Sequence, residues 1–497
     1  MFELKIDLGE WWWGGRASDG VGMPFDTESE LQIDLKDNRS NQNSPFFVSS
    51  HGRYFWSDQP FEMTVKQGVI CCSGPGPMKF SEGHGDLRSA FLDARALYFP
   101  PPADIPAPLL FTAPQYNTWI ELMYEQEESS ILDYAQRLLD EGYPPGVLMI
   151  DDNWQEDYGV WDFHPGRFRD PAGMVKKLQA MGFQVMLWVC PFLSPDSMTC
   201  REVQKAGGLL LDDAGEPRMI KWWNGYSAVL DLTRDPGRHW FEQQLQTLQQ
   251  RYGVDGYKFD AGDPPFYPVE GHRHCEAFNR LGAVFPLNEY RAAWKCADLP
   301  LAQRLADRCH AWDETGLASV VPNLLAQGMI GHPFVCPDMI GGGQFESFLG
   351  EGFSVDQELV VRYAQAAALC PMMQFSVAPW RILDDSHAEL CQRAAQLHAQ
   401  FGEEILEMAR RAAETGNPIL RPMEYQFPGH GYAPITDQFM LDDTLLVAPV
   451  LQPQQRERKV AVPPGRWKDD RGEVFEGPAE VQMPAPLERL IYLRRDE

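Results

Sequence analysis

The stretch GYKFDAGD, residues 256–263, has the length and aromatic content of a strand and ends with two aspartates, Asp260 and Asp263. Short apolar stretches of this kind recur through residues 109–410, and amphipathic helical stretches such as 129–142 and 171–182 alternate with them. This alternation is typical of parallel strands joined by crossover helices. We therefore predict that GYKFDAGD is one strand of a parallel α/β sheet.

Eight stretches in this region have a strand-like composition, and eight parallel strands close a (β/α)8 TIM barrel. GYKFDAGD is the fifth in this count. The predicted strands are 109–116, 147–152, 184–192, 228–233, 256–263, 304–309, 333–339 and 372–377.

Strand-and-turn sequence lies on both sides of the predicted barrel, and a Pro-rich connector at 99–108 precedes it. A chain of 497 residues accommodates a barrel with smaller appendages. We predict an α/β protein with an N-terminal β-sandwich domain over 1–105, the (β/α)8 barrel over 106–412, and a small C-terminal β-sandwich domain over 413–497.

The chain is strongly acidic, with 71 Asp and Glu against 43 Lys and Arg and a net charge of −28. This charge disfavours nucleic acid, anionic membranes and highly phosphorylated substrates as partners, and favours a neutral substrate. The ten cysteines form no C-x-x-C pair, which favours reduced thiols and no structural metal. No signal-peptide pattern opens the chain, so we expect a cytoplasmic protein; a homo-oligomer is compatible with the sequence.

Aspartates follow several of the predicted strands, where a parallel barrel carries its active site. A ring of carboxylates at a barrel mouth either binds a divalent metal or performs glycoside chemistry with a pair of carboxylates. Spacing alone leaves both alternatives open. The aspartates are Asp151, Asp152, Asp231, Asp260, Asp263, Asp307 and Asp338.

Several motifs, in one order along the chain, resemble those of glycoside hydrolase family 31. The most informative is YKFDAGD at 257–263, which resembles the KFDAGE variant of a branch associated with α-galactosides. The resemblance implies that Asp260 is the nucleophile and that neither a cofactor nor a metal is required. The other motifs are IDDNW at 150–154, LWVCPF at 187–192, WWNGYSAVLD at 222–231, HPFVCPDMIGG at 332–342, MMQFSVAPW at 372–380 and DDTLLVAPVL at 442–451.

The general acid/base is harder to place, because Asp307, Asp313 and Glu314 lie close together in the sequence. In related branches the acid precedes a tryptophan by five positions and a Gly-Leu pair follows. Asp307 fits this pattern with Trp312, so the resemblance favours Asp307, with Asp313 as the next choice. Arg304 matches an arginine that contacts the sugar in this family.

The resemblance also suggests substrate-binding residues, each with a structural alternative. Asp151 or Asp152 would hold hydroxyl groups far from the anomeric carbon, although the sequence does not show which of the pair points inward. The tryptophans could instead be core residues, and Asp338 could orient other groups. The full set of expected substrate-binding residues is Asp151, Asp152, Trp188, Trp223, Lys258, Arg304, Asp338 and Trp13.

The leading hypothesis is a retaining, exo-acting α-glycoside hydrolase without a cofactor, acting on an oligosaccharide or small α-glycoside. α-Galactosidase is the first choice, and α-glucosidase is the close alternative. A sugar-binding pseudoenzyme and a metal-dependent barrel hydrolase are alternatives from other classes. Retention requires Asp260 and Asp307 to face each other across one pocket, with carboxyl groups roughly 5 to 6 Å apart.

Overall fold

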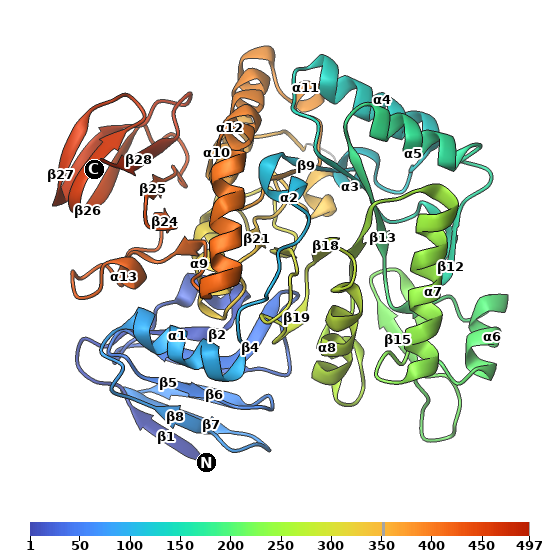
Figure 1. Ribbon diagram of the computed structural model, residues 1–497, viewed down its shortest axis with the longest axis horizontal. Helices are drawn as coiled ribbons and strands as arrows, with labels where there is room; N and C mark the ends of the chain where they lie inside the picture. The colour runs from blue at the N-terminus through green and yellow to red at the C-terminus, as the bar shows by residue number, and fades with distance from the viewer. Residues whose placement is uncertain (350–352, 497) are drawn as a thin grey trace.

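The computed structural model describes residues 1–349 and 353–496. A barrel of parallel strands surrounded by helices lies beside two β-rich regions, one formed by the N-terminal strands and the other by the C-terminal strands (Figure 1). This arrangement confirms the predicted fold class. Among the described residues, no helix combines the length and apolarity that a membrane span would need.

The barrel contains eight parallel strands in the order β21-β20-β18-β17-β13-β10-β9-β22, with no pairing between the two ends of this series in the described chain. Most of their residues are buried, as expected for strands enclosed by helices. The strands are β9 (Gln115–Asn117), β10 (Val147–Ile150), β13 (Gln184–Val189), β17 (Gly256–Phe259), β18 (Leu287–Tyr290), β20 (Gln303–Arg304), β21 (Val335–Cys336) and β22 (Gln374–Phe375).

Two of the eight predicted strands were placed wrongly. Residues 225–229 form β16, which pairs with β14 and β15 in a separate antiparallel sheet outside the barrel, and 109–112 form the short helix α2. The missed barrel strand is β18, whose buried Asn288 and Glu289 hide its strand character. Asp260 therefore follows the fourth barrel strand and not the fifth. The small sheet comprises β14 (Phe192–Leu193), β15 (Met219–Trp222) and β16 (Gly225–Val229).

Local signals in the sequence set the ends of the barrel helices. Asp170 caps α5 by accepting a hydrogen bond from the Gly173 N–H, and Pro171 occupies the first turn. Helix α7 ends at Gly253, whose left-handed backbone (φ 76°) suits a residue without a side chain. The main helices are α4 (Glu128–Asp140), α5 (Pro171–Ala180), α7 (Asp235–Tyr252), α8 (Gly271–Gly282), α9 (Val320–Met329), α10 (Gln357–Ala368) and α12 (Asp385–Thr415).

The N-terminal region forms two sheets, one in the order β1-β7-β6-β3 and one in the order β19-β4-β5-β8, with β2 also paired to β4. Strand β19 (Ala293–Trp294) belongs to the loop after barrel strand β18, and it runs parallel to the start of β4. The barrel thus adds a strand to the N-terminal sheet. The other elements are β1 (Phe2–Lys5), β2 (Trp12–Arg16), β3 (Leu31–Asp34), β4 (Gln42–Ser49), β5 (Tyr54–Trp56), β6 (Glu62–Lys66), β7 (Val69–Ser73), β8 (Lys79–Ser81) and α1 (Leu87–Tyr98).

The C-terminal region is a six-stranded antiparallel sheet around the fully buried Trp467. Figure 1 shows it beside α10 and α12, away from the N-terminal strands β1, β7 and β8. Its strands are β23 (Leu420–Arg421), β24 (Phe439–Leu441), β25 (Leu445–Ala448), β26 (Glu457–Asp469), β27 (Val474–Pro484) and β28 (Ile491–Arg495).

Candidate active site

A pocket of about 310 Å³ lies where the barrel strands end, a size within the usual range for small-molecule sites. It contains seven of the ten residues predicted for the site: both proposed catalytic aspartates, Asp151, Asp152, Lys258, Trp188 and Trp223. We call it the Asp260 pocket. Its lining residues are Ser40, Trp119, Tyr124, Asp151, Asp152, Trp188, Trp223, Lys258, Asp260, Arg291, Ala306, Asp307, Gln344, Phe345 and Glu346.

Asp260 lies directly after β17 and is held by donors on both carboxylate oxygens. Oδ1 accepts from Arg291 Nε at 3.0 Å and from the Ala261 N–H at 2.8 Å, while Oδ2 accepts from Trp188 Nε1 at 2.9 Å. Lys258 Nζ lies 3.9 Å from Oδ2. Burial by itself raises the pKa of Asp260, but the charges of Arg291 and Lys258 outweigh it and hold this pKa well below its usual range. Asp260 is therefore ionised.

Asp307 lies in the loop after β20, with about a third of its side chain exposed. Arg304 Nη1 donates to Asp307 Oδ1 at 2.9 Å and to Asp338 Oδ1 at 2.6 Å, and Arg304 Nε donates to Glu289 at 3.2 Å. Arg304 and Asp338 are fully buried behind Asp307 and do not line the pocket. Their prediction as sugar contacts is therefore not supported. They orient the Asp307 loop instead.

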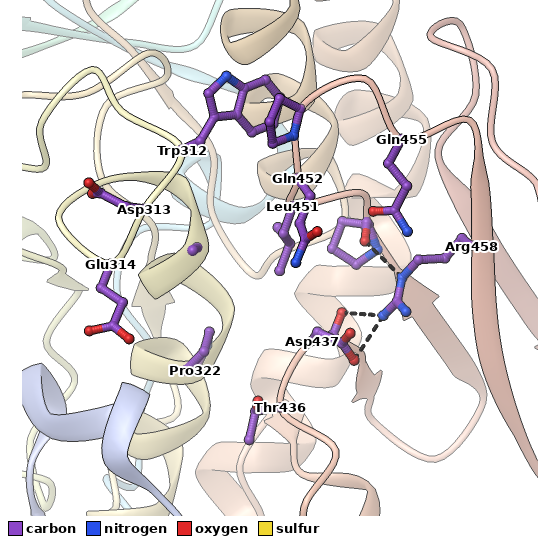
Figure 2. A pocket seen from close by; sticks show the side chains of 13 residues that line it. Trp312, Asp313, Glu314, Pro322, Thr436, Asp437, Leu451, Gln452, Gln455 and Arg458 are labelled. Atoms are coloured by element: carbon purple, nitrogen blue, oxygen red, sulfur yellow. Dashed lines mark hydrogen bonds and ion pairs between the residues drawn. The ribbon is translucent and has the colours of Figure 1, made fainter.

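The two competing acid candidates, Asp313 and Glu314, line a different cavity. This cavity has a volume of about 530 Å³ and separates the barrel loop that carries Trp312 from the C-terminal segments that carry Leu451 and Arg458 (Figure 2). Both acidic side chains are exposed, and neither lines the Asp260 pocket. Among the three acidic residues weighed for the acid/base, Asp307 alone shares a pocket with Asp260.

Asp152 is saturated with hydrogen-bond donors from the protein. Its Oδ1 accepts from the Asn153 N–H at 2.7 Å and from Gln155 Nε2 at 3.3 Å. Its Oδ2 accepts from the Tyr158 hydroxyl at 3.0 Å and from Asn224 Nδ2 at 2.7 Å. A carboxylate offers about four acceptor positions, so these four donors leave little capacity for a ligand.

Asp151, by contrast, keeps free acceptor capacity. It accepts from the Asp152 N–H at 2.8 Å and from Lys258 Nζ at 2.6 Å, so that about two of its acceptor positions stay open. Burial lowers the pKa of Lys258, but the charges of Asp151 and Asp260 raise it more, so Lys258 stays an ammonium ion. Burial and the charge of Asp151 raise the pKa of Asp152 to about 6. Of the adjacent pair, Asp151 is thus the better placed to accept a hydroxyl hydrogen.

Aromatic side chains form much of the remaining pocket wall. Trp188 and Trp223 were expected there, and Trp223 is half exposed. Sequence reasoning missed Trp119, Tyr124 and Phe345. The first two follow β9, whose position was predicted too early in the chain; correct placement of that strand would have brought them to the barrel mouth.

Two other lining residues, Arg291 and Ser40, were also missed. Arg291 follows β18, the strand that the sequence analysis did not find, so its position at a strand end was not apparent. Ser40 comes from the N-terminal region and reaches the pocket through a loop before β4. No chemical signal in the sequence around Ser40 distinguishes it from an ordinary turn residue.

Trp13, which was predicted to contact substrate, and Asp231 both lie outside the Asp260 pocket. Trp13 is 3% exposed and packs with residues of α1 and α9, because β2 is covered on both faces. The following Gly14 has φ +140°, and a Cβ there would lie 2.2 Å from the Phe46 carbonyl oxygen. Asp231 accepts hydrogen bonds from the N–H and hydroxyl of Thr233, near the start of α7.

Among the described residues, one group of three potential metal ligands lies close enough to share an ion: Asp7, Glu10 and His51. None of the three lines the Asp260 pocket, and Arg53 already forms an ion pair with Glu10. Three of the pocket carboxylates, Asp151, Asp260 and Asp307, are instead paired with the cations Lys258, Arg291 and Arg304, and Asp152 accepts four hydrogen bonds from neutral donors. This donor set does not fit a metal-dependent hydrolase.

A parallel barrel with an ionised Asp260 and a second carboxylate, Asp307, in one pocket at the strand ends has the architecture of a carboxylate-dependent glycoside hydrolase. Family models agree with this class. Residues 110–292 match the glycosyl hydrolases family 31 TIM-barrel domain, and residues 416–497 match the glycosyl hydrolase family 31 C-terminal domain. The chain belongs to glycosyl hydrolase family 31.

Curated relatives and solved structures are similar over much of the chain. The mouse myogenesis-regulating glycosidase is 35% identical over 80% of this chain and 58% of its own length. The SITS-binding protein of Tetronarce californica is 28% identical over 59% of this chain and 45% of its own length. The chain thus spans about half the length of these relatives. A Flavobacterium johnsoniae family 31 dextranase complexed with glucose superimposes with a TM-score of 0.84 at 19% identity, covering 99% of this chain and 66% of the dextranase chain, which supports the fold.

Proposed function

We propose that this protein is a retaining, exo-acting α-glycoside hydrolase with Asp260 as nucleophile and Asp307 as general acid/base. The observation that carries the proposal is that an ionised, cation-held Asp260 and the half-buried Asp307 line one pocket. A nucleophile must be ionised to attack, and the acid/base must reach both the leaving oxygen and solvent water.

The hydrogen bonds of Asp260 indicate which oxygen would react. Oδ1 accepts two hydrogen bonds, whereas Oδ2 accepts one, from Trp188. An Oδ2 lone pair would attack the anomeric carbon as the glycosidic C–O bond breaks, and the Asp307 proton would pass to the leaving oxygen. Water would then attack the same carbon, give its proton to Asp307 and release Asp260, with net retention.

Exo-action is supported by the loops that line the pocket together with the two proposed catalytic aspartates. Loops after β9 and β21 contribute Trp119, Tyr124, Phe345 and Glu346 to its lining. Asp151, with its open acceptor positions, and Lys258 would bind hydroxyl groups of a single terminal sugar. Trp13 is not part of this proposal, because it is buried and does not line the pocket.

For the sugar, we propose an α-galactoside, with an α-glucoside as the alternative within the family. The proposal rests on the similarity of the 257–263 motif to the branch associated with α-galactosides. It is also supported by the aromatic wall, because the axial O4 of galactose leaves one ring face largely apolar, and such faces stack on aromatic rings.

A panel of aryl α-glycosides tests the activity and the sugar together. Galactoside, glucoside, xyloside and sulfoquinovoside would be assayed with the purified protein, with Asp260→Asn as the inactive control. The expected result is a clear preference for the galactoside. Activity on the glucoside alone would favour the alternative. Binding of sugar without turnover of any aryl glycoside would support the sugar-binding pseudoenzyme.

A further inference from the structure

Segment 38–42, in the loop that enters β4, lies against the barrel between the loops that follow β18 and β20. Its side chains Asn38, Asn41 and Gln42 are almost completely buried, although all three are polar. Buried amides persist where their hydrogen bonds are satisfied. Here most of these partners belong to the barrel, so the segment connects the N-terminal sandwich with the candidate active site.

On the side of the acid/base, Asn41 holds the backbone next to Asp307. Asn41 Oδ1 accepts a hydrogen bond from the Ala306 N–H at 2.8 Å, and Ala306 directly precedes Asp307. Only the oxygen of the amide can accept from an N–H group, so the orientation of this side chain is determined. Gln42 Nε2 donates to the Arg304 carbonyl oxygen at 2.9 Å on the same strand end.

On the side of the nucleophile, the same segment holds the cation that contacts Asp260. Arg291 Nη1 donates to the Ser40 carbonyl oxygen at 2.8 Å, and Arg291 Nη2 donates to Asp263 at 2.6 Å. Asn38 Nδ2 donates to Asp263 at 2.9 Å. Segment 38–42 therefore reaches Asp260 through Arg291 and reaches Asp307 through Ala306.

We propose that segment 38–42 positions both carboxylates and that Asn41 is the positioning residue for Asp307; this inference rests on the proposed function. Within the described chain, the Asp307 carboxylate has one hydrogen-bond partner, Arg304, and is partly exposed. The position of the Asp307 carboxylate therefore depends strongly on the position of the Asp307 backbone. Without the Asn41 bond, the Ala306 N–H loses its acceptor and the loop is free to shift.

The test is the dependence of kcat/KM on the leaving group in Asn41→Ala. Two glycosides of the sugar that the wild type prefers are compared, one with a nitrophenyl and one with an alkyl leaving group. Displacement of the acid/base should lower kcat/KM for the alkyl glycoside by about 100-fold, because a misplacement of about 1 Å in a reacting group has an effect of this size. The nitrophenyl glycoside should lose much less, because its nitrophenolate leaving group departs without a proton. Asn41→Asp, which keeps an acceptor oxygen, should restore the wild-type ratio.

Asn43→Ala is the matched control, because Asn43 is equally buried but donates to the Leu35 carbonyl oxygen at 2.8 Å inside the sandwich. Asn43→Ala should lower the unfolding temperature and leave the ratio of the kcat/KM values for the two glycosides unchanged. If Asn41→Ala does not fold, Asn41→Ser, whose hydroxyl is too short for the same bond, should give the same leaving-group-dependent loss.

Equal losses on both substrates in the folded Asn41 variants, or the same selective loss in Asn43→Ala, would overturn the positioning role. These results leave the proposed function intact. An inactive wild type toward every glycoside in the panel would instead overturn the proposed function, and the positioning role with it.

Discussion

Arg291 donates through Nε to Oδ1 of Asp260 at 3.0 Å, and the two residues follow neighbouring parallel strands, β18 and β17. Because the strands are paired in register, the guanidinium reaches the carboxylate without a flexible loop between them. A fixed cation at this distance favours the ionised form of Asp260. The charge state that a nucleophile needs is thus a consequence of strand pairing.

Asp260→Asn should abolish most turnover and leave the fold intact, because the amide cannot attack the anomeric carbon. Asp260→Ala with azide should yield a glycosyl azide of inverted configuration, detected by NMR. Thermal unfolding of both variants monitors the fold. Near-normal turnover by Asp260→Asn would remove this residue as the nucleophile.

Asp307→Ala should slow alkyl glycosides by about 10²- to 10⁴-fold, the usual contribution of a general acid. Nitrophenyl glycosides should lose less in the first step, because their leaving group departs unprotonated. The measurement is kcat/KM across leaving groups of different pKa. Asp313→Ala, a change in the separate cavity of Figure 2, is the control and should retain wild-type rates.

Trp13→Ala should change stability and not KM, whereas Trp223→Ala should change KM and not stability. Trp13 is buried, so its truncation should lower the free energy of unfolding by about 3 to 5 kcal/mol without changing KM. Trp223 is half exposed and lines the Asp260 pocket, so its truncation should raise KM with little loss of stability. Chemical denaturation and steady-state kinetics measure the two effects. A raised KM in a folded Trp13→Ala would support the sequence-based prediction that Trp13 contacts substrate.

The pH dependence of stability should reveal Asp152. Its pKa is raised from 3.8 to about 6 in the folded protein. The folded state therefore binds this proton more tightly than the unfolded state does. Protonated Asp152 adds about 3 kcal/mol to the free energy of unfolding below about pH 4, and this contribution is lost as the pH rises through about 6. Asp152→Asn cannot ionise, so its stability relative to wild type should increase between these pH values.

Unfolding temperatures of Asp152→Asn and wild type, measured from pH 4 to pH 7, would show this difference. Asp213→Asn, at an exposed turn, is the control. A stability difference between Asp152→Asn and wild type that stays constant over this range would contradict the raised pKa.

Dialysis against a strong chelator should leave the rate unchanged, because a pair of carboxylates and water suffice for the reaction. The rate is measured before and after dialysis, and again after addition of zinc, calcium or magnesium. A large loss that one of these ions reverses would support the metal-dependent alternative.

The barrel could be predicted because strand-like and helical stretches alternate along residues 109–410. Asp260 and Asp307 could be proposed because the motifs around them resemble those of the family. The sequence-based prediction missed β18, because the buried residues Asn288 and Glu289 of this strand are polar and interrupt the apolar pattern expected of a buried strand. Arg291 follows β18, so it was not predicted as a residue of the site either. The sequence left two roles open for Asp338, because a strand-end position does not show whether a side chain faces the pocket or a neighbouring arginine.

Strand β19, from the loop after barrel strand β18, completes the N-terminal sheet by pairing with β4. A loop of the barrel consequently forms the edge strand of this sheet, and we expect the sandwich and the barrel to unfold as a single cooperative unit. A chimaera that exchanges the sandwich with that of a relative would have to carry residues 287–294 along with residues 38–49.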